Sequence, residues 1–365
     1  LILVVLYWKK VKVWLNSSRG PLAGTFFVGL LISAPIIVSM FQEKTGRLEV
    51  FSVFSYPRKV GDIIVILEEG KEKIGSVSYY LYHSETLNFT RGLFGRWFNH
   101  FSGRFLFFEG DYQNPRHSPP NQGMLLISDL VLLISGFLAL SRLKNSNKLR
   151  NFAILWLVLA PLPAVLSRDQ VHAVRALNMV IPLTLVSALG LAYLIAVLNS
   201  KIKVIRVLSY AFLVFMFLSS LVYYLDSYFI HLPKHQSKEW EYGYKQIVEV
   251  LTPIQSKYGT IKIQQSFAQP YIYFLFFQKY DPAKYQKQAK LVASEYKHDV
   301  GYVEKLDNIC FCPIDWPQNK KEHGSLVVAD DIRIPKNELE SDSVNLIEEI
   351  KYLNGETAFR VVEVR

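Results

Sequence analysis

Long uncharged apolar runs are the feature that most constrains how this chain can fold. Residues 22–41 and 176–198 contain no charged side chain. A helix of about 20 apolar residues is long enough to cross the hydrocarbon core of a bilayer. Residues 207–225 form a third run, and two weaker runs lie at 124–140 and 152–166. Together they predict five membrane spans, which makes the expected fold class an α-helical multi-pass membrane protein.

The two weaker runs leave an alternative open. Residues 152–166 form a run of only 15 residues, and a buried helix of a soluble core has the same length and composition. Residues 124–140 contain Asp129. An acidic residue inside a span is costly and marks a functional site, so Asp129 is a candidate site residue and a candidate partner for Arg168 or Arg175 at the outer end of a neighbouring span.

The basic residues indicate how the spans are oriented. The chain holds 41 Lys and Arg against 31 Asp and Glu, a formal charge of +10. Loops 9–21, 142–151 and 200–206 carry eleven basic residues and no acidic one. Short loops rich in Lys and Arg remain in the cytoplasm, so residues 42–122 and the tail are predicted on the outer face. This placement accounts for the positive charge and removes the support for nucleic-acid binding.

Two regions follow from this arrangement. Residues 1–225 form the membrane region, and its outer loop 42–122 contains predicted helices at 62–75 and 78–101. The second of these mixes aromatic and basic residues, which fits a helix at the membrane surface or an amphipathic helix packed on the protein. The opening LILVVLYW is too short to span and is interpreted as the stub of an earlier helix, which predicts that N-terminal spans are missing.

Residues 226–365 read as an extracytoplasmic α/β domain. Its predicted strands are 260–266, 308–314, 324–330 and 358–364, and its predicted helices are 239–257, 270–279 and 343–353. Asn354-Gly355 is expected to end the last helix and turn into the final strand. No glycine-rich phosphate loop follows a strand, so the domain is interpreted as an accessory domain.

The two cysteines are Cys310 and Cys312. Because strand residues alternate between opposite faces, we expect no bridge between them. They also lack the spacing of a metal-binding motif, and no metal ligand is assigned.

Two clusters on the predicted outer face could carry chemistry. The first, residues 109–123, contains Asp111, Arg116 and His117 among three prolines. Prolines stiffen a loop and fix the directions of its side chains, as a binding site requires. A polar turn that caps a span is the alternative.

The second cluster lies at 167–183 and contains Arg168, His172 and Arg175. The spacing of these residues predicts that they share one face of a helix. Two guanidinium groups and an imidazole in one place suit a phosphate group, because the arginine fork matches phosphate oxygens. Basic side chains that snorkel at a helix end are the alternative.

The two clusters and the α/β tail resemble a known family. Two segments are similar to segments of bacterial GT-C type glycosyltransferases that use lipid-linked sugars. The first is the outer loop before one span, FLFFEGDYQNPRHSPPNQG, and the second is the basic segment before the next span, SRDQVHAVRALNMVIPL. These glycosyltransferases are of the dolichyl-phosphate-mannose protein mannosyltransferase and aminoarabinose transferase kind. The resemblance implies a polyprenyl-phosphate-sugar donor, whose phosphate is bound by outer-face basic residues. It assigns substrate binding to Arg168, His172, Arg175, Asp111, Arg116 and His117.

The resemblance also implies what this chain lacks. The family's catalytic aspartate lies in a first outer loop, so the catalytic residue is expected upstream of residue 1. The acceptor would be a glycan, lipid or protein, and the setting would be the plasma or inner membrane. No cofactor is identified, although a divalent metal is compatible with the family. A transporter or flippase of lipid-linked substrates and a membrane-anchored sensor or binding protein are the alternative functions.

Overall fold

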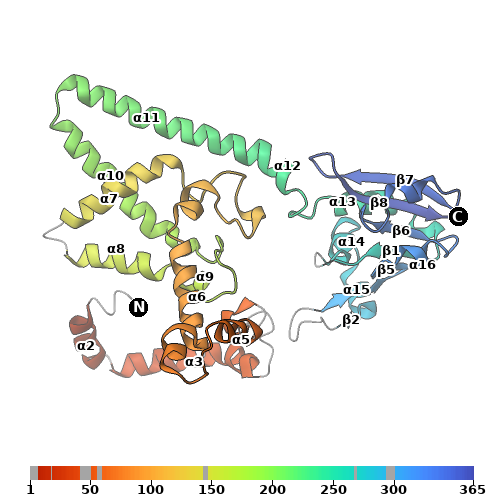
Figure 1. The fold of residues 1–365 in the computed structure, drawn as a ribbon, viewed down its shortest axis with the longest axis horizontal. Coiled ribbons are helices and arrows are strands. Elements are labelled where there is room, and N and C mark those ends of the chain that lie inside the picture. Colours follow the sequence, from red (N-terminus) through yellow and green to blue (C-terminus); the bar gives the residue numbers. More distant parts are fainter. Residues whose placement is uncertain are drawn as a thin grey trace. The chain divides into compact units, whose positions relative to one another are not determined.

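The computed structural model describes residues 7–17, 19–41, 51–55, 60–142, 147–266, 269–292 and 301–365. The chain divides into two compact units, Leu1–Phe229 and Ile230–Arg365 (Figure 1). The boundary expected from the sequence lies between residues 225 and 226, inside the same helical stretch. That stretch is formed by α11 (Lys203–Asp226) and the π-helical turn η6 (Ser227–His231).

The N-terminal unit is helical in its described part. Its other elements are α2 (Trp8–Ser17), α3 (Arg19–Phe41), η1 (Val53–Ser55), α5 (Val60–Glu69), η2 (Tyr79–His83), α6 (Glu85–Asn99), η3 (Arg104–Phe108), η4 (Pro115–His117), α7 (Ile127–Arg142), α8 (Asn147–Leu159), α9 (Leu162–Val165), η5 (Leu177–Met179) and α10 (Val180–Asn199).

The prediction of five membrane spans is wrong. Among the described residues, two helices are long and apolar enough to cross a membrane. These are the helical segments Leu177–Asn199, of 23 residues, and Lys203–Gln236, of 34 residues. The first comprises η5 and α10, and the second begins with α11 (Figure 1). This finding concerns the length and composition of the two helices.

Two of the other three apolar runs fold into shorter helices. Helix α7 has 16 residues, or about 24 Å at 1.5 Å per residue, against a hydrocarbon core of about 30 Å. The run at 152–166 is divided between α8 and α9. Pro161 falls at this break and Pro163 lies in the first turn of α9, and proline removes the backbone donor that an uninterrupted helix requires. Helix α3 has 23 residues and contains the shorter apolar segment Ala23–Pro35.

Helices α7 and α10 make a close backbone contact. A Cβ atom on Gly190 would collide with the carbonyl oxygen of Leu132, and one on Gly136 would collide with that of Val186. Small residues at such positions allow two helix backbones to approach each other. The buried cluster beside this contact includes side chains of η3, such as Phe105. The packing therefore fixes both ends of the loop that joins η3 to α7.

Helix α6 presents two different sides. The Ser84 hydroxyl accepts the Leu87 N–H at 3.4 Å and caps the N-terminus. Trp97 donates from its indole nitrogen to the Val158 carbonyl at 2.8 Å. By contrast, Phe94 and Phe98 are 60% and 63% exposed. The predicted helices 62–75 and 78–101 thus correspond to α5 and to η2 followed by α6, and both are shorter than expected.

The C-terminal unit is built on a mixed six-stranded sheet. Its strands have the order β4-β5-β1-β6-β8-β7. Strand β1 pairs in parallel with β5 and β6, whereas the other pairs are antiparallel. The strands are β1 (Ile261–Gln264), β4 (Lys305–Leu306), β5 (Ile309–Cys312), β6 (Leu326–Ala329), β7 (Val344–Lys351) and β8 (Thr357–Val364); β2 (Leu291–Val292) and β3 (Tyr302–Val303) form a separate pair.

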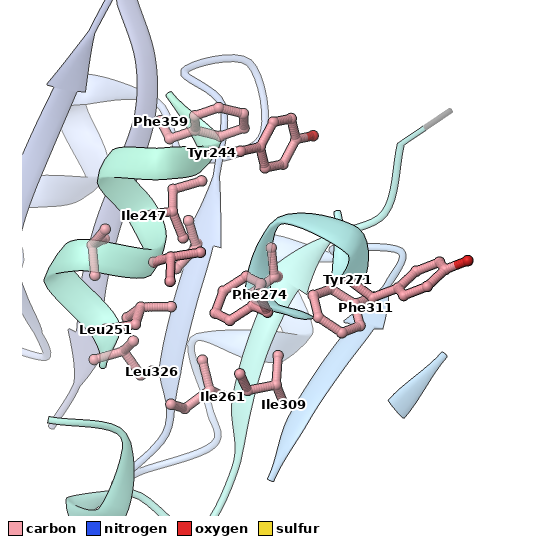
Figure 2. Close-up of a cluster of buried hydrophobic side chains, with 14 of the residues drawn as sticks. Tyr244, Ile247, Leu251, Ile261, Tyr271, Phe274, Ile309, Phe311, Leu326 and Phe359 are labelled. Carbon is pink, nitrogen blue, oxygen red and sulfur yellow. The ribbon is translucent and has the colours of Figure 1, made fainter. Parts of the chain in front are cut away.

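Short helices complete this unit: α12 (Leu232–Gln236), α13 (Tyr244–Leu251), η7 (Gln255–Lys257), α14 (Tyr271–Phe277), α15 (Pro282–Gln288), α16 (Trp316–Asn319) and η8 (Lys336–Glu340). Figure 2 shows Ile247 and Leu251 of α13 and Phe274 of α14 packed over the sheet. Leu326 of β6 belongs to this cluster, whereas its neighbour Val327 belongs to a second one. Because successive strand residues point to opposite faces, β6 is covered on both sides.

Three of the predictions for this unit need correction. The predicted helix at 343–353 is wrong, because these residues contain strand β7. A register shift between Leu346 and Glu348 leaves Ile347 outside the ladder. The bulge interrupts the alternation of a strand, so the apolar residues take a spacing that resembles a helix. Gly355 has φ of 92° and lies in the β7–β8 hairpin turn, rather than after a helix.

The predicted helix at 239–257 is also longer than the structure shows, since α13 covers only Tyr244–Leu251. The expectation for the cysteines is wrong as well, because Cys310 and Cys312 form a disulfide with their Cα atoms 5.5 Å apart. Residues two apart on a strand share one face, which makes the bridge geometrically accessible.

Candidate functional site

The loop that follows η3 is held in a tight turn. Gly110 has φ of 64°, a conformation that favours glycine, and a Cβ atom there would lie 2.6 Å from the Ser118 Cβ. The Ser118 hydroxyl accepts the Asp111 N–H at 3.0 Å and donates to the Glu109 carbonyl at 3.3 Å. The turn therefore directs the Asp111 side chain into the protein.

Asp111 is the centre of the hydrogen-bond network, and none of its surface is exposed. Its Oδ1 accepts the backbone and side-chain N–H groups of Asn114 at 3.2 and 3.0 Å. Its Oδ2 accepts from His117 Nδ1 and from the Ala173 N–H, both at 2.8 Å. One buried carboxylate thus joins the two clusters identified in the sequence.

His100 is a second buried connection, and its role was not predicted from the sequence. Its Nδ1 donates to the Arg96 carbonyl at 2.7 Å, and its Nε2 accepts the His172 N–H at 3.2 Å. Burial lowers the pKa of His100 below 6.5, against weaker effects of Arg96 and Asp111 that raise it. These contacts require the neutral ring, with the proton on Nδ1.

His172 lies next to His117, with ring centroids 5.1 Å apart. Its Nδ1 accepts the Arg175 N–H at 3.3 Å, which leaves Nε2 as the protonated nitrogen of the neutral ring. Burial lowers the pKa of His172, and the charge of Arg175 lowers it further, while Asp111 and Asp169 oppose the shift. His172 is therefore a neutral hydrogen-bond donor near pH 7.

Arg168, His172 and Arg175 do not lie on one helix, so that prediction is wrong. They lie in turns that precede η5, and Arg168 is anchored by its N–H, which donates to the Phe51 carbonyl at 3.0 Å. The two arginine side chains nevertheless converge. Their guanidinium carbons lie 5.6 Å (Arg168) and 4.8 Å (Arg175) from the Phe51 ring centroid.

Asp169 partly neutralises these arginines. Its carboxylate is 2.8 Å from Arg175 and 3.9 Å from Arg168. The predicted third arginine, Arg116, is exposed next to His117 in η4 and has no ion pair within the described part of the chain. The site therefore combines the guanidinium groups of Arg168 and Arg175 and two imidazoles with two carboxylates.

Asp129 does not belong to this site. It lies in the first turn of α7, where its Oδ2 accepts the Leu126 N–H at 3.0 Å. A carboxylate in this position stabilises the N-terminus of a helix. The expectation that Asp129 pairs with Arg168 or Arg175 is not met, since no ion pair of Asp129 is found among the described residues.

Asp111, His117 and His172 each offer one ligand atom, and these atoms lie within 4.8 Å of one another. The sequence did not predict this group, because its members come from two loops that only the tertiary structure brings together. No known protein family, curated protein or solved structure matches the chain.

Proposed function

We propose that the N-terminal unit is part of a membrane glycosyltransferase that binds a polyprenyl-phosphate-linked sugar. The observation that supports this most is the convergence of Arg168 and Arg175 immediately before η5 and α10. Within the described part of the chain, helix α10 belongs to one of the two helical segments long and apolar enough to span a membrane. A cationic site at the end of such a helix suits a substrate with an anionic head and an apolar chain.

The guanidinium groups favour a phosphate ligand. Arg168 and Arg175 balance the charge of the two nearby carboxylates, Asp111 and Asp169, and the exposed Arg116 of η4 adds a positive charge to the same loop as Asp111. Phosphate accepts paired hydrogen bonds from a guanidinium group, and each such charge-assisted bond contributes about 1.5–3 kcal/mol. The Nε2–H group of neutral His172 is a further donor toward a phosphate oxygen.

The chemistry proposed is a displacement at the anomeric carbon. A bond forms between the acceptor oxygen and this carbon, while the bond from the carbon to the phosphate oxygen breaks. The arginines stabilise the negative charge that grows on the departing polyprenyl phosphate. In the family that the chain resembles, a carboxylate accepts the proton of the acceptor hydroxyl, and the residues of this chain would supply donor binding. The C-terminal unit would be an accessory domain on the outer face.

Binding of a polyprenyl phosphate tests the proposal directly. The full chain in detergent micelles is titrated with undecaprenyl phosphate, and undecaprenol serves as the ligand without a phosphate. We expect Arg175→Ala to weaken undecaprenyl phosphate binding by about tenfold or more, since a lost charge-assisted contact costs about 1.5–3 kcal/mol. Arg175→Lys should recover part of the affinity, because lysine retains the charge but cannot donate the paired hydrogen bonds of a planar guanidinium group.

Arg206→Ala is the matched control. Arg206 lies near the start of α11, beside the opposite end of α10 from Arg175. Its removal changes the net charge equally and should leave undecaprenyl phosphate binding unchanged. Equal affinity for undecaprenol and undecaprenyl phosphate, or unchanged affinity in Arg175→Ala, would exclude a phosphate site at these arginines.

A further inference from the structure

Asp111, His117 and His172 form the one group of three potential metal ligands in the described residues. We propose that these three side chains bind a divalent transition-metal cation, with Zn²⁺ as the ion whose preferences they match. The proposal concerns the binding of the cation alone. The metal-binding proposal is independent of the glycosyltransferase function, because its test uses no lipid.

The ligand types favour a transition metal. Imidazole nitrogen and carboxylate oxygen are both common Zn²⁺ ligands, whereas Mg²⁺ and Ca²⁺ prefer oxygen ligands alone. Three protein ligands leave the fourth position of a tetrahedral ion open for water or a substrate oxygen. Arg168 and Arg175 lie beside the cluster, so an anion held by them is the natural candidate for this position.

The cluster must contract to hold the ion. In a tetrahedral site, Zn²⁺ bonds to nitrogen and oxygen of about 2.0–2.2 Å place two ligand atoms about 3.3–3.6 Å apart. The ligand atoms here lie within 4.8 Å of one another, and the two imidazole ring centroids are separated by 5.1 Å. Rotation of the imidazole rings toward each other would close this difference.

The hydrogen bonds of the cluster are of the kind that a cation can replace. A proton lies between His117 Nδ1 and Asp111 Oδ2, which are 2.8 Å apart. The Arg175 N–H occupies His172 Nδ1 over a longer distance of 3.3 Å. Asn114 and Ala173 hold the Asp111 carboxylate in place from outside the cluster. Contacts of this type orient ligands and raise metal affinity.

The positive charge of a dication beside two arginines has to be offset. The Asp111 carboxylate belongs to the cluster itself, and Asp169 pairs with Arg175 at 2.8 Å. These two carboxylates reduce the repulsion between the cation and the guanidinium groups. Because each imidazole binds a metal in its neutral form, the ligands themselves add no positive charge.

The chain contains a natural control for this cluster. His83 Nδ1 lies 2.8 Å from Glu72 Oε2, the same separation as in the His117–Asp111 pair. No third ligand joins this second pair within the described part of the chain. A histidine and carboxylate pair alone should not retain a transition metal, so His83→Ala isolates the effect of the third ligand.

The test measures metal binding by the purified full chain. Protein without a histidine tag is treated with chelator, titrated with Co²⁺ followed by visible absorbance, and then exchanged with Zn²⁺ for elemental analysis after gel filtration. We expect one Zn²⁺ per chain and a Co²⁺ spectrum that Zn²⁺ displaces. His117→Ala and His172→Ala should each weaken binding by more than about tenfold, while His83→Ala leaves it unchanged.

Two results would overturn the proposal. One is less than stoichiometric Zn²⁺ in the wild-type protein, and the other is unchanged binding in both His117→Ala and His172→Ala. Circular dichroism and the metal-free unfolding temperature show whether each variant is folded. If His117→Ala is unfolded, the smaller change His117→Gln is tested in its place, and undiminished Zn²⁺ binding by a folded His117→Gln protein counts equally against the site.

Discussion

Asp111 Oδ2 accepts hydrogen bonds from His117 Nδ1 and from the Ala173 N–H, each at 2.8 Å. The two donors lie in loops that are separated by α7, α8 and α9 along the chain. A buried carboxylate satisfied by both loops makes the structure of each depend on the other. This relationship leads to the first expectation below.

Asp111→Asn should destabilise the N-terminal unit. An amide has one accepting oxygen and cannot take all four hydrogen bonds of the carboxylate, and bonds to a charged group contribute about 1.5–3 kcal/mol each. We expect a lower unfolding temperature, with faster hydrogen exchange in 111–118 and 171–176. Glu109→Gln is the control, because this glutamate forms an ion pair with Arg104 and its side chain is 48% exposed. Similar effects of the two substitutions would contradict the central role of Asp111.

Gly190→Ala should separate α7 from α10. The added methyl group would collide with the Leu132 carbonyl oxygen, and overpacking of this kind costs about 1–3 kcal/mol. The same substitution at Gly95 of α6 meets no atom within 4 Å and should be neutral or stabilising, since alanine favours a helix by about 1 kcal/mol. Thermal unfolding in detergent measures both variants. Equal unfolding temperatures would contradict the close contact between α7 and α10.

Lowering the pH should destabilise the C-terminal unit, because the carboxylate of Glu349 becomes protonated. Burial acts to raise the pKa of this carboxyl group, but hydrogen bonds from Arg360 and Thr357 outweigh burial, and the pKa lies below the ordinary 4.5. The unfolded state therefore takes up the proton first, so the stabilisation is complete above about pH 4.5 and is lost as the pH falls below it. Hydrogen exchange in β7 and β8 at several pH values measures this loss.

Glu349→Gln should reduce the difference in exchange between pH 6 and pH 4, because the substituted side chain does not titrate. Glu340→Gln, on an exposed residue, is the control and should retain the wild-type pH dependence. Glu349 forms an ion pair with Arg360, whose side chain is 6% exposed. If Glu349→Gln also retains the wild-type pH dependence, this ion pair is not the source of that dependence.

If α10 and α11 span the membrane, the N-terminus of α10 and the C-terminus of α11 should lie on the same side of it, opposite to the loop that joins the two helices. Ser200 lies between the two helices, and Lys238 follows the second. In a background with Cys310 and Cys312 replaced by serine, an impermeant thiol reagent added to intact cells should label Lys238→Cys but not Ser200→Cys. The basic residues near Ser200 favour the cytoplasm for that loop. Equal labelling of the two variants would exclude this pair of spans.

The sequence was most informative where one local pattern matched the final environment. The predicted strands at 260–266, 308–314 and 324–330 contain β1, β5 and β6, and the predicted strand at 358–364 covers all of β8 except Thr357. Their alternating or continuous apolar residues reflect burial against one or both faces of the sheet. Strand β7 was mistaken for a helix because the bulge at Ile347 disturbs that alternation. Apolar composition likewise identified α10 and α11, but it overestimated the number of helices with the length of a span.

The residues of the candidate site were named from the sequence, but their arrangement was decided by the tertiary structure. Local spacing predicted a helix for Arg168, His172 and Arg175, whereas hydrogen bonds to Phe51 and Asp111 hold this segment as a loop. The contribution of His100 and the proximity of Asp111, His117 and His172 depend on contacts between residues more than 50 positions apart. The sequence determines the chemistry of each side chain, but the distances between separate loops are set only when the helices that carry the loops pack together.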